Sequence, residues 1–183
     1  SVLALGGNHL THDIAIGLGA PLREAEEIKH KFGVAMASMV EENEMIDVPS
    51  VGGRNNRTMQ KRVLASIIED RFREIFELIA HEIEKTHFHT LMASGVVITG
   101  GTCIMSGADR LASQVLNLPV RVGYPENISG LREMIYSPKY ATSVGLVRYG
   151  ITSNQGKLNF VGDDTNLFHK VSRRMKDWMQ EFF

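Results

Sequence analysis

One stretch decides the fold of this chain: Gly95-Val96-Val97-Ile98-Thr99-Gly100-Gly101-Thr102-Cys103-Ile104-Met105-Ser106-Gly107. The apolar, β-branched run Val96–Ile98 predicts a buried strand. It ends at Gly100 and Gly101, where the backbone can take a positive φ and no side chain projects toward a ligand. Residues 108–116 then predict a helix. Such a unit holds a ligand over exposed backbone at the carboxyl end of a strand, although by spacing alone a purely structural turn explains the pattern equally well.

The composition predicts a globular protein. With 183 residues and 43% hydrophobic content, the chain can bury a core, as one large domain or two small subdomains. A formal charge of -1 argues against a nucleic-acid partner, which requires clustered excess Lys and Arg. Cys103 is the only cysteine, so no internal disulfide can form, and no apolar run reaches the roughly 20 residues of a spanning helix. We expect a cytosolic protein unless something anchors it.

Hydrophobic periodicity predicts the remaining elements. Strands are expected at residues 1–5, 45–51 and 120–122. Helices are expected at residues 11–18, 22–32 and 141–149, and as a longer helix from Leu64 with apolar residues on one face. Thr11 is the expected N-cap of the first helix, and Gly33 is expected to end the second. Residues 58–63 fit either a strand or the start of a helix. His81, His87 and His89 lack a completing ligand set and are expected to be surface histidines, with no metal site.

Three segments resemble the adenosine site of the actin-like ATPase superfamily. Thr99-Gly100-Gly101-Thr102, followed by Ser106-Gly107-Ala108-Asp109-Arg110-Leu111, resembles its adenosine motif, which implies that the glycines let adenine and ribose lie against the backbone. Ala25-Glu26-Glu27-Ile28-Lys29 resembles the segment that borders the adenosine, although a solvated face of mixed charge is the alternative. Lys139 falls at a position where the family places a residue beside the adenine. The resemblance implies these nucleotide-binding residues: Glu26, Lys29, Gly100, Gly101, Thr102, Ile104, Met105 and Lys139.

The last thirty residues change character. Residues 152–165 are rich in Ser, Asn, Gln, Gly and Asp and predict a flexible linker. Beyond them, large apolar residues recur at helical spacing opposite a basic face, which suits insertion at an anionic membrane surface. A terminal helix docked on the domain is the alternative. The predicted membrane residues are Phe168, Val171, Arg174, Met175, Trp178, Met179, Phe182 and Phe183.

Four features in this order resemble the C-terminal half of the bacterial FtsA cell-division family. They are Leu5-Gly6-Gly7-Asn8-His9-Leu10-Thr11-His12-Asp13-Ile14-Ala15, Val51-Gly52-Gly53-Arg54, the Gly100-Gly101 unit, and residues 138–150 with the linker and tail. The resemblance implies an α/β chain that forms half of an actin-like (ribonuclease H-like) fold. Residues 1–32 and 95–150 would form the inner nucleotide-binding subdomain, and residues 33–94 a smaller inserted α/β subdomain. Residues 151–166 would be the linker and residues 167–183 the membrane-targeting helix.

The resemblance also implies a function. This family binds ATP with Mg, self-associates, and tethers FtsZ filaments to anionic lipids at the cytoplasmic face of the inner membrane, at the division site, together with other divisome proteins. Arg71 and Glu74 match the charged pair that binds the FtsZ C-terminal peptide in this family. An Arg guanidinium can donate two hydrogen bonds to a carboxylate of the peptide, and the Glu can pair with a basic residue of the peptide. A surface ion pair is the alternative. The basic residues 54–57 match a region of contact between protomers.

The chain departs from the family at the phosphates. Neither Asp-x-Gly-Thr nor Asp-Ile-Gly-Gly-Gly-Thr occurs, so metal, phosphate and catalytic groups are expected outside this sequence. We therefore expect a fragment that binds adenosine weakly, hydrolyses no ATP and holds no catalytic residue. Asp13 is expected as a helix N-terminal residue favoured by the dipole. The competing interpretation is another actin-like ATPase or enzyme, MreB-like, PilM-like or sugar-kinase-like.

Overall fold

The computed structural model describes residues 1–49, 56–86, 94–126 and 135–153. The chain forms two compact units, Ser1–Thr142 and Ser143–Phe183. Among its described residues, the first unit has the helices α1 (Gly7–Leu18), α2 (Leu22–Phe32), α3 (Lys61–Lys85) and α4 (Ala108–Leu116), with 3-10 turns η1 (Ala37–Met39), η3 (Gly101–Ile104) and η4 (Pro138–Tyr140). Its strands are β1 (Met45–Val48), β2 (Arg57–Gln60), β3 (Val96–Ile98) and β4 (Val120–Val122). Helix α6 (Ala141–Ser153) begins at its end.

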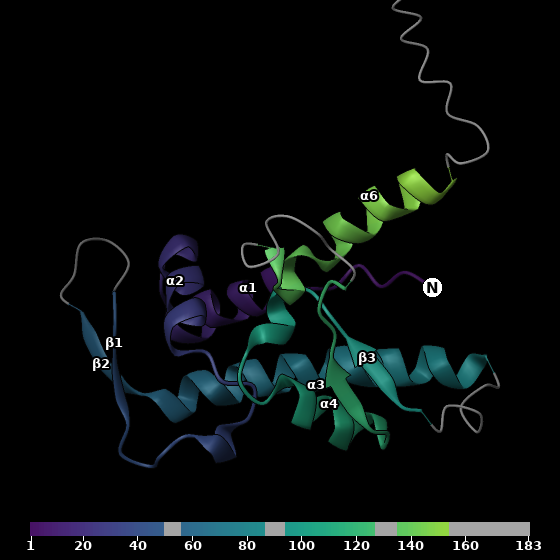
Figure 1. The fold of residues 1–183 in the computed structure, drawn as a ribbon. Helices are drawn as coiled ribbons and strands as arrows, with labels where there is room; N and C mark the ends of the chain where they lie inside the picture. The colour runs from purple at the N-terminus through teal and green to yellow at the C-terminus, as the bar shows by residue number, and fades with distance from the viewer. Residues whose placement is uncertain (50–55, 87–93, 127–134, 154–183) are drawn as a thin grey trace, which may run out of the picture. The chain divides into compact units, whose positions relative to one another are not determined.

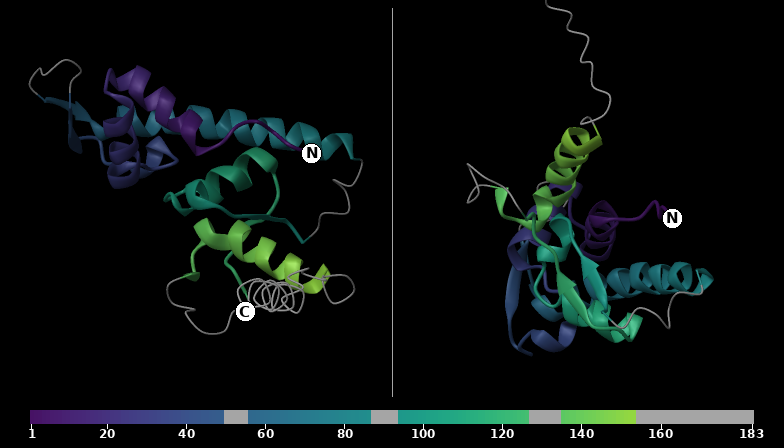
Figure 2. Two further views of the ribbon diagram at one scale, coloured as in Figure 1. Left: turned by 90° about the horizontal axis from the view of Figure 1, so that it is seen from above. Right: turned by 45° about the vertical axis from the view of Figure 1, so that its right-hand side comes forward.

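The core forms around α3, which packs against α1 and α4 (Figures 1 and 2). The spacing of its apolar residues puts one stripe on the buried side over 25 residues, and Phe72 stacks on Phe76 with ring centroids 5.6 Å apart. The fully buried large side chains are Leu10, Ile14 and Leu18 of α1, Leu64 and Ile68 of α3, Leu111 of α4 and Val48 of β1. This one cluster therefore fixes the helices that carry the candidate site.

Helix α1 lies very close to α3. A Cβ built on Gly17 would stand 2.5 Å from Cδ1 of Ile67, so the absence of a side chain at Gly17 permits the approach. One turn along each helix, Asp13 contacts Arg71. The two contact points run in opposite directions along the two sequences, so the helices are antiparallel.

The described strands of the first unit form two small sheets. Strands β1 and β2 pair in antiparallel register, with Ile46 opposite Met59. Strands β3 and β4 are parallel, with Val97 opposite Arg121. Gly95 precedes β3; its φ is 79°, and a Cβ built on it would lie 2.2 Å from the carbonyl oxygen of Pro119. Only glycine fits that backbone, so Gly95 lets Val96 reach Pro119 and start the pairing.

Several predicted elements are confirmed. Helices α2 and α4 and strands β3 and β4 occupy their predicted ranges, and α3 continues from Lys61 with the predicted apolar stripe. Strand β3 is less buried than predicted, since Val97 is 52% exposed. Residues 58–63 divide between β2 and the first turn of α3. Gly33 caps α2 as predicted, but with φ at -61° rather than in the left-handed region. Glycine is required there because a built Cβ would meet the carbonyl oxygen of Lys29 at 2.3 Å.

Other predictions were wrong. Residues 1–5 form no strand, since none of the described strands pairs with them, and Val2 is 93% exposed. Helix α1 begins at Gly7 rather than Thr11, because Gly6 and His9 supply the cap: the Gly6 N–H donates to His9 Nδ1 at 3.2 Å. Thr11 is an interior residue of α1. Strand β1 stops at Val48, since Pro49 has no N–H to extend the ladder.

The boundary between the last described helix and the predicted linker lies later than predicted. Helix α6 continues through Ser153, so the first residues assigned to the linker are helical. The rest of the predicted linker and the predicted membrane helix at 167–183 lie outside the described residues. In the described helices, no segment is both long and apolar enough to cross a bilayer. The predicted division into an inner and an inserted subdomain stays a prediction.

Candidate nucleotide-binding site

A cavity of about 560 Å³ opens between α1, α2, η3 and η4 of the first unit. Seven of the eight predicted nucleotide-binding residues line it: Glu26, Lys29, Gly101, Thr102, Ile104, Met105 and Lys139. Gly7, Asn8, His30, Gly33 and Ser106 also line it and were not predicted. Segments far apart in the sequence thus meet at one hollow. The Gly-Gly-Asn start of α1 was the available signal for two of the missed residues, because helix N-termini offer free N–H groups.

Gly100 shapes the cavity without being one of its lining residues. Its φ of 110° and ψ of 169° lie outside the range of other residues. Its N–H donates to the carbonyl oxygen of Pro138 at 3.2 Å, and its own carbonyl accepts from Cys103 at 3.3 Å. A Cβ on the next residue, Gly101, would lie 3.7 Å from Cβ of Lys139. The glycine pair therefore brings η4, and Lys139 with it, against the start of η3.

The opposite wall is set by two further close approaches. A Cβ built on Gly7 would lie 2.4 Å from Oγ1 of Thr102, so the first turn of α1 touches η3. Beyond α2, the Ala35 N–H donates to the carbonyl oxygen of Ser106 at 2.9 Å. These two contacts hold the start of α1 against η3 and the residues after α2 against Ser106.

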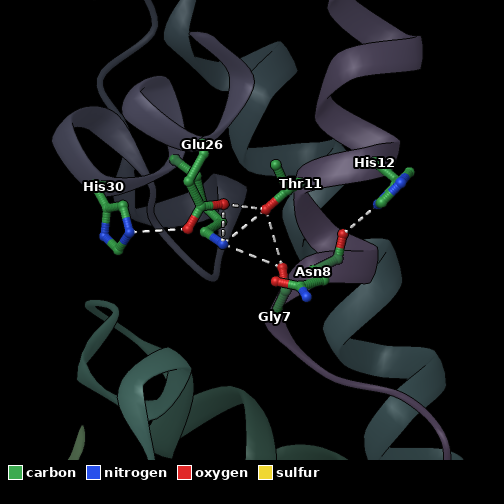
Figure 3. Close-up of polar contacts among 7 residues, drawn as sticks. Gly7, Asn8, Thr11, His12, Glu26 and His30 are labelled. Atoms are coloured by element: carbon green, nitrogen blue, oxygen red, sulfur yellow. Dashed lines mark hydrogen bonds and ion pairs between the residues drawn. The ribbon is translucent and has the colours of Figure 1, made fainter. Parts of the chain in front are cut away.

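Lys29 is buried at the base of this site, with 7% of its side chain exposed. Its ammonium donates to the Gly7 carbonyl oxygen at 3.1 Å, to Thr11 Oγ1 at 2.8 Å and to Glu26 Oε2 at 2.6 Å (Figure 3). An ammonium has three N–H donors, so these acceptors use all of them. Burial of this charge is tolerated because it is paired and fully hydrogen-bonded.

Thr11 and His30 complete the network around Glu26 (Figure 3). The Thr11 hydroxyl contacts Glu26 Oε2 and the Gly7 carbonyl oxygen, and its single proton serves one of them at a time. His30 Nε2 lies 2.9 Å from Glu26 Oε1. Burial raises the pKa of Glu26, but the hydrogen bonds from Lys29 and Thr11 and the charges of Lys29 and His30 outweigh it and lower that pKa.

The predicted Glu26–Lys29 pair is therefore present, but its geometry differs from a pair of free ligand contacts. Lys29 holds α2 to the first turn of α1 and fixes the carboxylate of Glu26. Glu26 keeps 38% of its side chain exposed at the cavity. Contact of either residue with a nucleotide stays a prediction.

Arg71 and Glu74 form an ion pair on α3, and a third residue joins them. Arg71 Nη1 contacts Glu74 Oε2, while Arg71 Nε contacts Asp13 Oδ2 and Nη2 donates to Asp13 Oδ1 at 3.0 Å. The hydrogen bonds to Asp13 raise the pKa of Arg71, against the effect of burial. Asp13 lies in the second turn of α1, so its prediction as an N-terminal helix residue was wrong. No local sequence pattern predicts a partner on another helix.

Comparison with known proteins decides the family. The family model described as "Cell division protein FtsA" matches residues 1–145. The chain belongs to the FtsA family. FtsA of Pseudomonas aeruginosa is 35% identical over 188 residues, and FtsA of Escherichia coli K12 is 36% identical over 190 residues. Each alignment covers 100% of this chain and 45% of the relative, so the chain spans less than half the length of these FtsA proteins.

Solved structures show the same fold. The structure of MreB5 of Spiroplasma citri bound to ADP superposes with a TM-score of 0.59 at 15% identity, over 82% of this chain and 45% of that one. MreB5 bound to AMPPNP gives a TM-score of 0.60 at 15% identity, over 84% and 46%. The predicted FtsA membership and the actin-like α/β fold are therefore confirmed.

Proposed function

We propose that this FtsA-type chain supplies the adenosine side of an ATP–Mg site and links FtsZ filaments to the inner membrane. The observation that carries the nucleotide proposal is the cavity, in which residues of α2, η3 and η4 converge although the sequence separates them widely. Its volume of about 560 Å³ lies within the range typical of small-molecule sites.

The lining suits an adenosine. Bare backbone at Gly101 allows a flat base or ribose to approach, and Ile104 and Met105 add apolar surface for the base. The exposed part of the Glu26 carboxylate is an acceptor for ribose hydroxyls. Phosphate, magnesium and catalytic groups are expected from sequence beyond this chain. We therefore expect this chain to bind adenosine weakly and to hydrolyse no ATP.

Gly101→Leu tests the nucleotide proposal. Because a Cβ on Gly101 meets only Lys139 Cβ at 3.7 Å, a larger side chain can enter the cavity without displacing the backbone. Saturation-transfer NMR with adenosine and ATP should give signals for the parent chain that Gly101→Leu abolishes. Gly6→Ala is the matched control, since a Cβ on Gly6 has nothing within 4 Å and its φ of -175° suits any residue. Equal adenosine signals in folded Gly101→Leu and in the control would refute a site at this cavity.

The tethering proposal rests on α3 and on the tail. Arg71 offers a carboxylate of the FtsZ C-terminal peptide a charged fork, and Glu74, with 52% of its side chain exposed, offers a basic residue an acceptor. The basic residues near β2 are proposed to contact other FtsA protomers, and other divisome proteins are further expected partners. Fluorescence anisotropy with a labelled FtsZ C-terminal peptide tests the first contact: Arg71→Ala should weaken binding, whereas Arg23→Ala, at an exposed ion pair of α2, should not.

The membrane proposal is supported by the sequence pattern of residues 167–183. Co-sedimentation with anionic vesicles should separate the full chain from a chain ending after Ser153, which keeps α6 whole. Binding should be lost with the tail and weakened by salt, because basic residues contribute about 1 kcal/mol each near an anionic surface. If both proteins pellet equally, or neither does, the tail is not the anchor.

A further inference from the structure

A triad of charged residues, Asp13, Arg71 and Glu74, joins α1 to the predicted peptide-binding pair on α3. Arg71 and Asp13 each expose 25% of their side chains, whereas Glu74 exposes 52%. The Arg71–Asp13 contact is therefore the more enclosed part of the triad, and Glu74 is its solvent-facing member.

The guanidinium has capacity left for a partner. Its five N–H groups form two forks, one along Nε and Nη2 and one across the two terminal nitrogens. Asp13 occupies the Nε–Nη2 side with both carboxylate oxygens, and Glu74 takes one N–H of Nη1. These contacts use three donors and leave one N–H on each terminal nitrogen. A second carboxylate could therefore bind without displacing Asp13.

Packing fixes the position from which Asp13 acts. Gly17 lies one turn further along α1, where Ile67 of α3 comes very close. A Cβ built on Gly17 would stand 2.5 Å from Cδ1 of Ile67. Leu10 and Ile14 of α1 are fully buried, so α1 cannot slide without opening the core. The carboxylate of Asp13 is thus held at a fixed place beside the flexible Arg71 side chain.

We propose that Asp13 is a positioning residue of the FtsZ-peptide site: it fixes the Arg71 guanidinium so that the remaining N–H groups meet an acidic residue of the peptide. This inference rests on the proposed peptide contact of Arg71. Because Asp13 holds the Arg71 side chain in one orientation before the peptide binds, that side chain loses less conformational entropy on binding. The sign of the effect is informative. Charge alone would make Asp13 repel an acidic group, so its removal would strengthen binding, whereas loss of positioning weakens it.

The test measures affinity for a labelled FtsZ C-terminal peptide by anisotropy, using the full chain at low and high salt. Asp13→Asn should lower the affinity about three- to tenfold at both salt concentrations, since orientation is not screened. In an Arg71→Lys background, which lacks the fork, the same change should alter affinity less than about twofold. Glu27→Gln is the matched control: it removes one negative charge at an exposed ion pair of α2 and should leave affinity unchanged.

Each outcome decides the proposal. Unchanged or tighter binding by Asp13→Asn overturns it while leaving the Arg71 contact intact. If Arg71→Ala binds the peptide as the parent does, both the peptide site and the role of Asp13 fail. If Asp13→Asn does not fold, Asp13→Glu keeps the charge but moves the carboxylate by one methylene. It should then weaken binding in a folded chain, and parental affinity there also overturns the proposal.

Discussion

Lys29 of α2 donates a hydrogen bond to the carbonyl oxygen of Gly7, the first residue of α1, at 3.1 Å. Through this contact a buried cation joins two helices at the base of the candidate nucleotide site. The same ammonium binds Thr11 and Glu26, so one side chain holds the acidic edge of the cavity in place.

Lys29→Met should destabilise the chain by about 1–3 kcal/mol, because it removes donors from three acceptors that are partly or fully buried. The free energy of unfolding in urea measures this, with Arg23→Ala as control because 88% of that side chain is exposed. The control should shift stability by less than about 0.5 kcal/mol. Equal stabilities of the two variants would show that the Lys29 network contributes nothing to folding.

Glu26 should make stability depend on acid pH. The folded state lowers the pKa of Glu26 below the ordinary value of 4.5. The ionised carboxylate therefore adds to the free energy of unfolding above pH 4.5, and this contribution is lost as the pH falls through the lowered pKa. The difference in unfolding free energy between the parent and Glu26→Gln should therefore be present at pH 5 and shrink below about pH 4.5. A difference that stays constant down to pH 3 would contradict a lowered pKa.

Gly95→Ala should destabilise strongly. The new Cβ would lie 2.2 Å from the backbone oxygen of Pro119, and the φ of 79° is itself strained for alanine. We expect a loss of about 2–4 kcal/mol, in the range of severe backbone conflicts. Thermal unfolding compares it with Gly6→Ala, which has open space for a Cβ. If both variants melt at the parental temperature, the β3–β4 pairing differs from the one described.

Two isoleucines test the position of the core. Ile68 of α3 is 0% exposed, and Ile16 of α1 is 81% exposed. Ile68→Ala should cost about 2–5 kcal/mol, because it removes buried methyl groups and leaves a cavity. Ile16→Ala should change stability by less than about 0.5 kcal/mol. Chemical denaturation of both variants checks this, and comparable losses would place Ile16 in an interface.

Elements with local sequence signals were predicted correctly. The apolar run at Val96–Ile98, the glycine pair at Gly100 and the stripe from Leu64 each depend on neighbours within a few residues. They therefore predicted β3, the turn and α3 in place. Seven residues of the cavity followed from motif resemblance, because the glycine turn and its flanking segments can be recognised from their residue types and order.

Tertiary structure alone decided the contacts between distant segments. Thr11 lies inside α1 because His9 caps Gly6, and it serves the site only because α2 brings Lys29 and Glu26 to it. Asp13 finds its partner 58 residues later, on a helix that Gly17 allows to approach. Residues 1–5 have strand-like sequence but no paired strand within the described chain. Ion pairs between elements and sheet pairing depend on which surfaces contact each other in the folded chain, and local periodicity does not specify those contacts.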